Sequence, residues 1–250
     1  AHKLLAKECP SDFVREMEQD ERGCTEAFWH KMGTLDWMAL IVPEQYDGVG
    51  GELMDLVLML EEMGRACVPG PFFSTVVTGA TTLIHYGSEE QKQQFLPKVA
   101  DAQLVLTLAL TEPGTTRWDP FAISTAAAVD GDGHVINGTK LFVFDAHAAD
   151  YLICAARTAG APGDAAGITL FLVDAKAPGI RSTPLKTIGG DKQFEVVFER
   201  VRVSRSAVIG SVGEGGGHLT GILHHAAVCK CAEMVGGAEK VLEMAADYAK

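Results

Sequence analysis

The chain has 250 residues, of which 47% are hydrophobic and 22% are charged, and its formal net charge is −12. This length suffices to bury a sizeable core, as one large domain or two smaller ones. The negative charge argues against nucleic-acid binding, which needs a basic surface. No apolar run reaches the length of a membrane span, and the first residues lack a signal-peptide apolar region.

Cysteine usage indicates the compartment. Six cysteines are scattered through the chain without the spacing of a disulfide framework. In a mid-sized chain this pattern favours free thiols in a reducing environment. We therefore expect a cytoplasmic protein, with the mitochondrial matrix as the alternative.

Residues 1–106 carry mostly helical signals and are predicted to form an N-terminal helical domain. In LMDLVLMLEEMGRAC (Leu53–Cys67) the apolar residues recur at the three- and four-residue spacing of a buried helix face. Ser88 precedes two glutamates in SEEQKQQFLPKVA, which predicts an N-cap followed by an acidic first turn.

Residues 107–213 are predicted to form a middle β-domain, because the hydrophobic period changes to two. Short runs such as YLICAA, ITLFLV and FEVVFERVRV are rich in β-branched and aromatic residues. DGDG (130–133) and the pair Asn137–Gly138 are typical hairpin turns. Strands spaced this closely, without helices between them, favour an antiparallel β-barrel or sandwich.

Residues 214–250 return to a helical period and are predicted to begin a C-terminal helical bundle. The preceding SVGEGGG segment favours a flexible linker, and the long helix needs further helices or a partner to pack against. The predicted class is therefore α+β multidomain, with an N-terminal helical domain, a middle antiparallel β-barrel and a C-terminal helical bundle.

Few local motifs indicate chemistry. HHAAVCKC lacks the turn that brings two zinc-binding sulfurs together, so no metal site is expected, and no GxSxG segment exposes a nucleophilic serine. TEPGTTRWDP (111–120) combines hydroxyls, a Pro-Gly turn and one arginine. This composition suits an anionic, flat ligand, but a plain turn has the same pattern.

Four segments in order resemble the acyl-CoA dehydrogenase family. They are VPEQYDGVGGELMDLVLMLEEMGRA, HYGSEEQKQQFLPKVADAQLVLTLALTEPG, VINGTKLFVFDAHAADYLICAA, and FLVDAKAPGI followed by FEVVFERVRVSRSAVIG. The resemblance covers nearly the whole chain. It implies bound FAD, an acyl-CoA substrate of fatty acid β-oxidation and an electron-transferring flavoprotein as partner, in a homo- or hetero-oligomer. The family reaction passes the α-proton of the thioester to a glutamate base and the β-hydride to flavin N5.

The resemblance also implies site residues in the TEPG segment. Leu108, Leu110 and Thr111 match the strand that lines the flavin with backbone groups and a hydroxyl. Thr116 and Arg117 match the family's Gly-Ser, which meets the flavin pyrophosphate and the acyl-CoA, so Arg117 is expected to bind substrate.

A second flavin-side segment comprises Phe142, Val143 and Phe144, which match the family's Trp-Ile-Thr. The family threonine donates to flavin N5, whereas Phe144 has no side-chain donor. The glutamate base of one family branch aligns near Ala226, and in the larger branch it falls beyond Lys250. The catalytic residue is therefore unassigned, with Glu233 as the nearest helical carboxylate.

Three functions fit these matches. The first is an FAD-dependent acyl-CoA dehydrogenase. The second is a non-catalytic or partly degenerate subunit of a hetero-oligomeric acyl-CoA dehydrogenase, and the third is a flavin-dependent oxidase or monooxygenase on the same fold. The altered motifs at Phe144 and Ala226 make the second function more plausible for this chain than for a family member with the usual residues. The first function nevertheless agrees best with the whole pattern.

The cation in TEPGTTRWDP gives a first prediction. Replacing Arg117→Ser is expected to change flavin retention or acyl-CoA affinity, because the arginine stands where the family has a small hydroxyl near phosphates. Flavin content after gel filtration and a binding titration with acyl-CoA measure the two effects. If both stay at the wild-type values, the segment is a plain turn.

Overall fold

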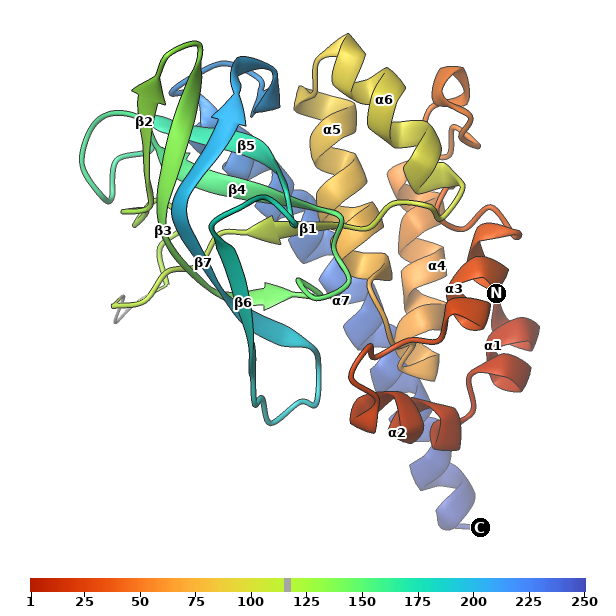
Figure 1. The fold of residues 1–250 in the computed structure, drawn as a ribbon. Coiled ribbons are helices and arrows are strands. Elements are labelled where there is room, and N and C mark those ends of the chain that lie inside the picture. The colour runs from red at the N-terminus through yellow and green to blue at the C-terminus, as the bar shows by residue number, and fades with distance from the viewer. Residues whose placement is uncertain (115–117) are drawn as a thin grey trace.

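The computed structural model describes residues 1–114 and 118–250. It places a set of helices beside an eight-stranded sheet, with the long helix α7 (Gly215–Tyr248) running along both (Figure 1). α7 packs on β5 of the sheet, and on α4, α5 and η2 of the helical part. The last helix in the sequence therefore returns to the first helices and joins them to the sheet.

The helical part begins with several short helices, and α4 and α7 form a pair at its centre. Its elements are α1 (His2–Glu8), α2 (Ser11–Gln19), α3 (Glu26–Gly33), η1 (Glu44–Tyr46), α4 (Leu53–Ala66), η2 (Phe73–Ala80), α5 (Thr81–Tyr86) and α6 (Glu89–Ala100). The periodicity predicted α4 correctly, and Leu56, Leu60 and Met63 of its apolar positions are buried, whereas Leu53 at its start is exposed.

The N-cap predicted for α6 is confirmed. The hydroxyl of Ser88 accepts a hydrogen bond from the Gln91 backbone amide at 3.2 Å, and the Gln91 side chain accepts one from the Ser88 amide at 3.0 Å. This reciprocal pair satisfies two amide donors that the first helical turn leaves without intrahelical partners.

The sheet is antiparallel in most of its pairs. Its strands are β1 (Leu106–Ala109), β2 (Ala126–Asp130), β3 (Gly133–Phe144), β4 (Tyr151–Arg157), β5 (Ile168–Asp174), β6 (Ile180–Leu185), β7 (Gln193–Ser204) and β8 (Val208–Ile209). They follow the order β6-β7-β3-β2-β4-β5-β8, and β1 pairs with β4. The middle β-domain is thus confirmed, with one finding that the strand spacing did not indicate. β1 runs parallel to β4, and β2 also pairs with β4 in parallel, at Ala126 and Arg157. The β2–β3 hairpin gives β1 and β4 the long connection that a parallel pair needs.

Local signals located one hairpin and missed two strands, β6 and the two-residue β8. Asp130 pairs with Gly133 across a two-residue turn, as the DGDG motif predicted. β6 was not predicted, because four of its six residues are exposed and it contains Pro184. An edge strand tolerates both features, since its outer side makes no ladder hydrogen bonds.

The hairpin predicted at Asn137–Gly138 was wrong. Both residues lie inside β3, where the pairing with β7 shifts register. A Cβ at Gly138 would stand 2.7 Å from Cα of Thr125, so this glycine permits a close backbone approach. The Asn137 side chain accepts a hydrogen bond from the Arg200 amide at 2.8 Å. A bulge, and not a turn, explains the dipeptide.

The glycine-rich segment before α7 is a packed junction, and the prediction of a flexible linker was wrong. Glu214 forms a β-bridge with Ile168, and Gly215 and Gly216 are buried in the first turn of α7. A Cβ at Gly215 would lie 2.9 Å from the Ile168 carbonyl oxygen. The glycines therefore let the start of α7 sit directly against β5.

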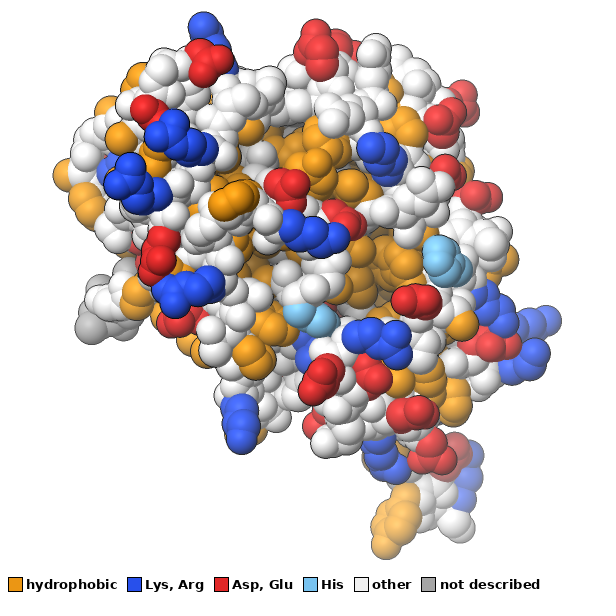
Figure 2. All heavy atoms as spheres, viewed as in Figure 1, with side chains coloured by type: hydrophobic (Ala, Val, Ile, Leu, Met, Phe, Trp, Pro, Cys, Tyr) orange, Lys and Arg blue, Asp and Glu red, His pale blue; other side chains and the backbone are white. Residues whose placement is uncertain are grey.

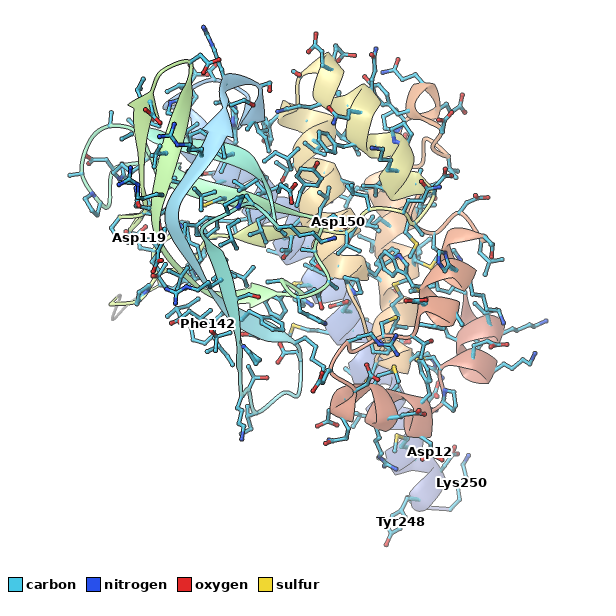
Figure 3. The ribbon with its side chains drawn as sticks, viewed as in Figure 1. Asp12, Asp119, Phe142, Asp150, Tyr248 and Lys250 are labelled. Carbon is cyan, nitrogen blue, oxygen red and sulfur yellow. The ribbon has the colours of Figure 1, made fainter. Side chains whose placement is uncertain are left out.

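α4 and α7 cross at backbone contact. A Cβ added at Gly64 would overlap the carbonyl of Glu233, and one at Gly236 would overlap the carbonyl of Glu61. Beyond this crossing the last turns of α7 project past the other helices, where Tyr248 and Lys250 lie (Figures 1 and 3). Val241, Leu242 and Met244 on these turns are exposed, which agrees with a helix that needs a further partner.

The crossing predicts opposite effects for two adjacent glycines. Gly236→Ala is expected to lower the free energy of unfolding by about 2 kcal/mol, because the new methyl group forces the helices apart. Gly237→Ala is the matched control, since its Cβ would be 3.6 Å from the nearest atom, the Gly64 carbonyl oxygen. It is expected to stabilise the protein by about 0.5–1 kcal/mol through helix propensity. Urea denaturation measures both, and equal effects would contradict the close crossing.

Candidate functional site

A cavity of about 670 Å³ lies between the sheet and the helices. Its walls come from α2, from the region of α4 and η2, from the end of β1, from β3, from the β6–β7 connection and from α7. Figure 2 shows hydrophobic side chains gathered between the two halves of the molecule, while charged side chains of both signs surround them. Segments that are distant in sequence thus line one cavity, which is partly open to solvent.

Five of the sequence-predicted site residues line this cavity. They are Leu108, Leu110, Thr111, Phe142 and Phe144. The first three lie in or just after β1, and the two phenylalanines lie at the end of β3. The structure therefore brings together the two segments that the resemblance assigns to the flavin.

The remaining predicted residues lie elsewhere. Val143 is 1% exposed and packs in the sheet core, so its side chain does not reach the cavity. Thr116 and Arg117 lie outside the described residues.

The end of β3 has an irregular backbone that displays its aromatic residues. Phe142 and Asp145 both have positive φ, 55° and 54°, and the β3–β7 register shifts between Lys140 and Val143. A non-glycine residue in this region is strained and persists only where its surroundings impose it. The Thr107 hydroxyl donates to the Phe144 carbonyl at 2.6 Å, which fixes this backbone. As a result Phe142 is 51% exposed on the sheet side of the molecule (Figure 3).

A buried ion pair lies under the TEPG segment. Lys140 Nζ is 2.6 Å from Glu112 Oε1, and the two side chains are 0% and 3% exposed. The same ammonium donates to the Leu110 carbonyl at 3.1 Å. Glu112 also accepts hydrogen bonds from the amides of Ser124 and Thr125, at 2.8 and 3.0 Å, and therefore closes the base of the β1–β2 connection.

Burial alone would raise the pKa of Glu112, but the Lys140 charge and the hydrogen bonds outweigh it and lower the pKa from 4.5 to about 2. The carboxylate therefore stays ionised at neutral pH. A buried pair of this kind resists the loss of either partner, because the remaining charge would have no compensation.

A second carboxyl group joins the sheet to the helical part. The Ser74 hydroxyl of η2 donates to Asp145 Oδ2 at 2.6 Å, and the Asp145 amide donates to the Lys192 carbonyl at 2.8 Å. Burial raises the pKa of Asp145. Lys192 in turn donates from its ammonium to the Glu18 carbonyl at 2.8 Å. These contacts tie three cavity walls together.

Arg157 at the end of β4 anchors the connection from another side. Its guanidinium donates to the carbonyls of Phe121, Ile123, Asp164 and Ala166, at distances of 2.7 to 3.0 Å. It is only 8% exposed. The guanidinium fork thus joins two loops through carbonyl oxygens.

Sequence reasoning missed Glu112, Lys140 and Arg157. One signal was available: Lys140 shares the inward period-two face of β3 with Ile136, and a buried lysine needs a carboxylate partner. Within the described part of the chain, no group of three or more His, Cys, Asp or Glu residues is placed to hold a metal. His225 contacts Thr81 at 3.3 Å and Cys229 is buried in the helical core.

Comparison with known proteins identifies the fold family. The profile of the acyl-CoA dehydrogenase N-terminal domain matches residues 1–103, and that of the middle domain matches residues 107–201. The chain belongs to the acyl-CoA dehydrogenase family. Members of this family are oxidoreductases that use FAD.

Individual members of the family resemble the chain over most of its length. Acyl-CoA dehydrogenase fadE12 of Mycobacterium bovis is 30% identical over 231 residues, which are 90% of this chain and 59% of that protein. An acyl-CoA dehydrogenase from Geobacillus kaustophilus superposes with a TM-score of 0.90 at 27% identity, over 99% of this chain and 66% of that one. The ChsE4–ChsE5 complex from Mycobacterium tuberculosis gives a TM-score of 0.79 at 31% identity, over 90% of this chain and 58% of that one.

The chain thus spans about three-fifths of the length of these acyl-CoA dehydrogenases. Among its described residues, none of the helices is long and apolar enough to cross a membrane.

The buried pair predicts a specific loss of stability. Glu112→Gln is expected to lower the free energy of unfolding by about 3 kcal/mol at pH 7, because Lys140 keeps a buried charge without a counter-ion. Glu199→Gln is the matched control, since it breaks the exposed ion pair with Arg181 and is expected to cost less than about 1 kcal/mol. Urea denaturation compares them.

The same pair sets the pH dependence. Because the pKa of Glu112 is lowered from 4.5 to about 2 in the folded protein, its contribution to stability is complete above pH 4.5. It is lost as the pH falls towards 2, where protonated Glu112 resembles glutamine. The stability gap between wild type and Glu112→Gln should therefore shrink across this range. A gap that stays constant down to pH 2 would contradict the ionised pair.

Proposed function

We propose that the protein takes part in FAD-dependent α,β-dehydrogenation of an acyl-CoA thioester, with the cavity as the site where flavin and acyl group meet. One observation carries this proposal. The resemblance assigns two segments to the flavin, 108–111 and 142–144. β2 and most of β3 lie between them in the chain, yet both segments line one cavity of about 670 Å³. A volume of this size is typical of cofactor and ligand sites.

The residues present fit a flavin ring. Phe142 and Phe144 are 51% and 47% exposed although both are aromatic, so they offer flat apolar surface towards the cavity. Leu108 adds an aliphatic contact and Thr111 a hydroxyl. When bound, FAD would accept a hydride from the β-carbon of the acyl group.

The protein's own groups would position the ligands and exclude water. Lys140 holds the Leu110 carbonyl, and Thr107 holds the Phe144 carbonyl, so the backbone on both sides of the flavin wall is fixed. Fixed donors and dipoles need no reorganisation during a reaction. We assign no catalytic base within the described residues: Ala226 packs on the helical core, and Glu233 is engaged by Lys230.

The proposal extends to organisation and partners. Residues 1–106, 107–213 and 214–250 would be the N-terminal, middle and C-terminal domains. Electrons would pass to an electron-transferring flavoprotein, in the cytoplasm or the mitochondrial matrix. A homo- or hetero-oligomer is proposed, and the similarity to a subunit of the ChsE4–ChsE5 complex supports the second.

A second candidate is a subunit that keeps the fold without completing the reaction. Two features favour it over an ordinary family member. Phe144 offers no side-chain donor at the flavin wall, and an alanine stands at position 226. Such a subunit would contribute the cavity of one protomer to a shared site.

Visible spectroscopy of the full-length protein tests these candidates. We expect FAD addition to give a yellow protein with a resolved flavin spectrum, and anaerobic acyl-CoA to bleach it. Binding of FAD without bleaching would support the non-catalytic subunit, and rapid reoxidation by oxygen would favour the oxidase alternative. A protein that shows no flavin absorbance after FAD addition would contradict the proposal.

A variant pair ties the spectrum to the cavity. Phe142→Ala is expected to weaken FAD binding about 10-fold through loss of aromatic contact. Val129→Ala shortens an exposed apolar side chain of β2, outside the cavity, and should bind FAD as wild type does.

A further inference from the structure

The helical wall of the cavity carries an ion pair that the proposed reaction does not use. Lys230 and Glu233 both line the cavity and lie one turn apart on α7, where the ammonium donates to the Glu233 carboxylate. The same ammonium lies 3.9 Å from the centre of the Phe73 ring of η2. Their neighbours in this wall are apolar: Met63, Leu223 and Met234.

A purely hydrocarbon acyl group would be poorly matched to this wall. The side chains of Lys230 and Glu233 are 53% and 24% exposed, so methylene groups laid against them would displace part of their water, and a charge that loses water needs another polar partner. The Glu233 carboxylate provides only part of that compensation. The helical wall therefore disfavours a simple alkyl chain at this place.

The ammonium has capacity for one more partner. A lysine has three N–H donors. In the part of the chain that the structure describes, Lys230 donates one hydrogen bond, to Glu233, and directs its charge at the Phe73 ring. An oxygen atom on the bound molecule can accept the remaining bond.

The charge of the lining decides which kind of oxygen fits. Among the described lining residues there are four carboxyl groups, at Glu18, Asp145, Asp191 and Glu233, and two ammonium groups, at Lys192 and Lys230. A ligand carboxylate beside Lys230 would also face Glu233, which repels it at short range. A neutral acceptor keeps the attraction to the ammonium without that repulsion.

We propose that the Lys230–Glu233 pair selects acyl groups that carry a neutral acceptor oxygen, a ketone or a hydroxyl, at a distance from the thioester. This inference rests on the proposed function, because it assumes that an acyl-CoA occupies the cavity. It assigns to α7 a role in specificity that is separate from the flavin wall formed by β1 and β3.

Binding measurements on the full-length, FAD-loaded protein test the proposal. The probes are three sets of acyl-CoA, with eight, twelve and sixteen carbons. Each set contains the alkyl thioester, the thioester with a ketone one carbon from its far end, and the thioester with a terminal carboxylate. Isothermal titration calorimetry gives the dissociation constants without relying on turnover. In at least one set the ketone should bind about 10-fold more tightly than the alkyl chain, and the carboxylate should bind more weakly than the ketone.

Two variants assign the preference to the pair. Lys230→Met keeps an unbranched side chain but removes the donor, so the ketone preference should fall to less than about 2-fold. Glu233→Gln removes the repulsion, so the carboxylate should now bind more tightly than in wild type. Lys240→Met is the matched control, because Lys240 pairs with Glu243 on the same helix outside the cavity and should leave all three affinities unchanged.

The outcomes separate this proposal from the proposed function. If alkyl and ketone thioesters bind equally in every set, or if the carboxylate binds most tightly to wild type, the selection by Lys230 and Glu233 is wrong while the acyl-CoA site stands. If no acyl-CoA binds at all, the proposed function fails and this inference fails with it. Retention of the ketone preference in Lys230→Met would likewise overturn the assignment.

Discussion

The buried ion pair between Glu112 and Lys140 is the interaction on which the site depends. It joins β3 to the segment that directly follows β1, beside the cavity, and it closes the base of the β1–β2 connection. Burying two charges is costly unless each is satisfied by further polar groups. Here the Leu110 carbonyl accepts a hydrogen bond from the Lys140 ammonium, and the Ser124 and Thr125 amides donate hydrogen bonds to the Glu112 carboxylate. These hydrogen bonds offset the cost of burying the two charges, and they fix the geometry of the flavin wall.

The opposite wall depends on α7. Buried glycines seat its first turn on β5, and Gly64 and Gly236 allow it to cross α4 at backbone contact. One rigid element therefore links the sheet to the helical part and carries Lys230 and Glu233 along the cavity. The position of this pair relative to Phe142 and Phe144 is set by helix packing, and not by a loop.

Much of the fold could be predicted because its signals are local. The buried face of α4 follows from a 3.6-residue period, and the start of α6 from the Ser88 cap. Asn137–Gly138 misled because the glycine is required by a close approach to Thr125, which lies just before β2 and is distant in sequence. The resemblance located Phe142 and Phe144, but it did not reveal Glu112 and Lys140, which are 28 residues apart and meet only after the sheet forms. Long-range polar partners of this kind cannot be paired from spacing alone.

The anchoring of the β1–β2 connection has a mechanical consequence. Glu112 holds the base of this connection through a group that titrates, whereas Arg157 holds residues 121 and 123 through neutral carbonyl oxygens. Acid that neutralises Glu112 leaves the guanidinium contacts intact, since carbonyl oxygens do not ionise and arginine stays charged. Acid therefore weakens one of the two restraints and leaves the other in place. Residues 121 and 123 stay held to β4 by Arg157, while the hydrogen bonds from the Ser124 and Thr125 amides to Glu112 weaken.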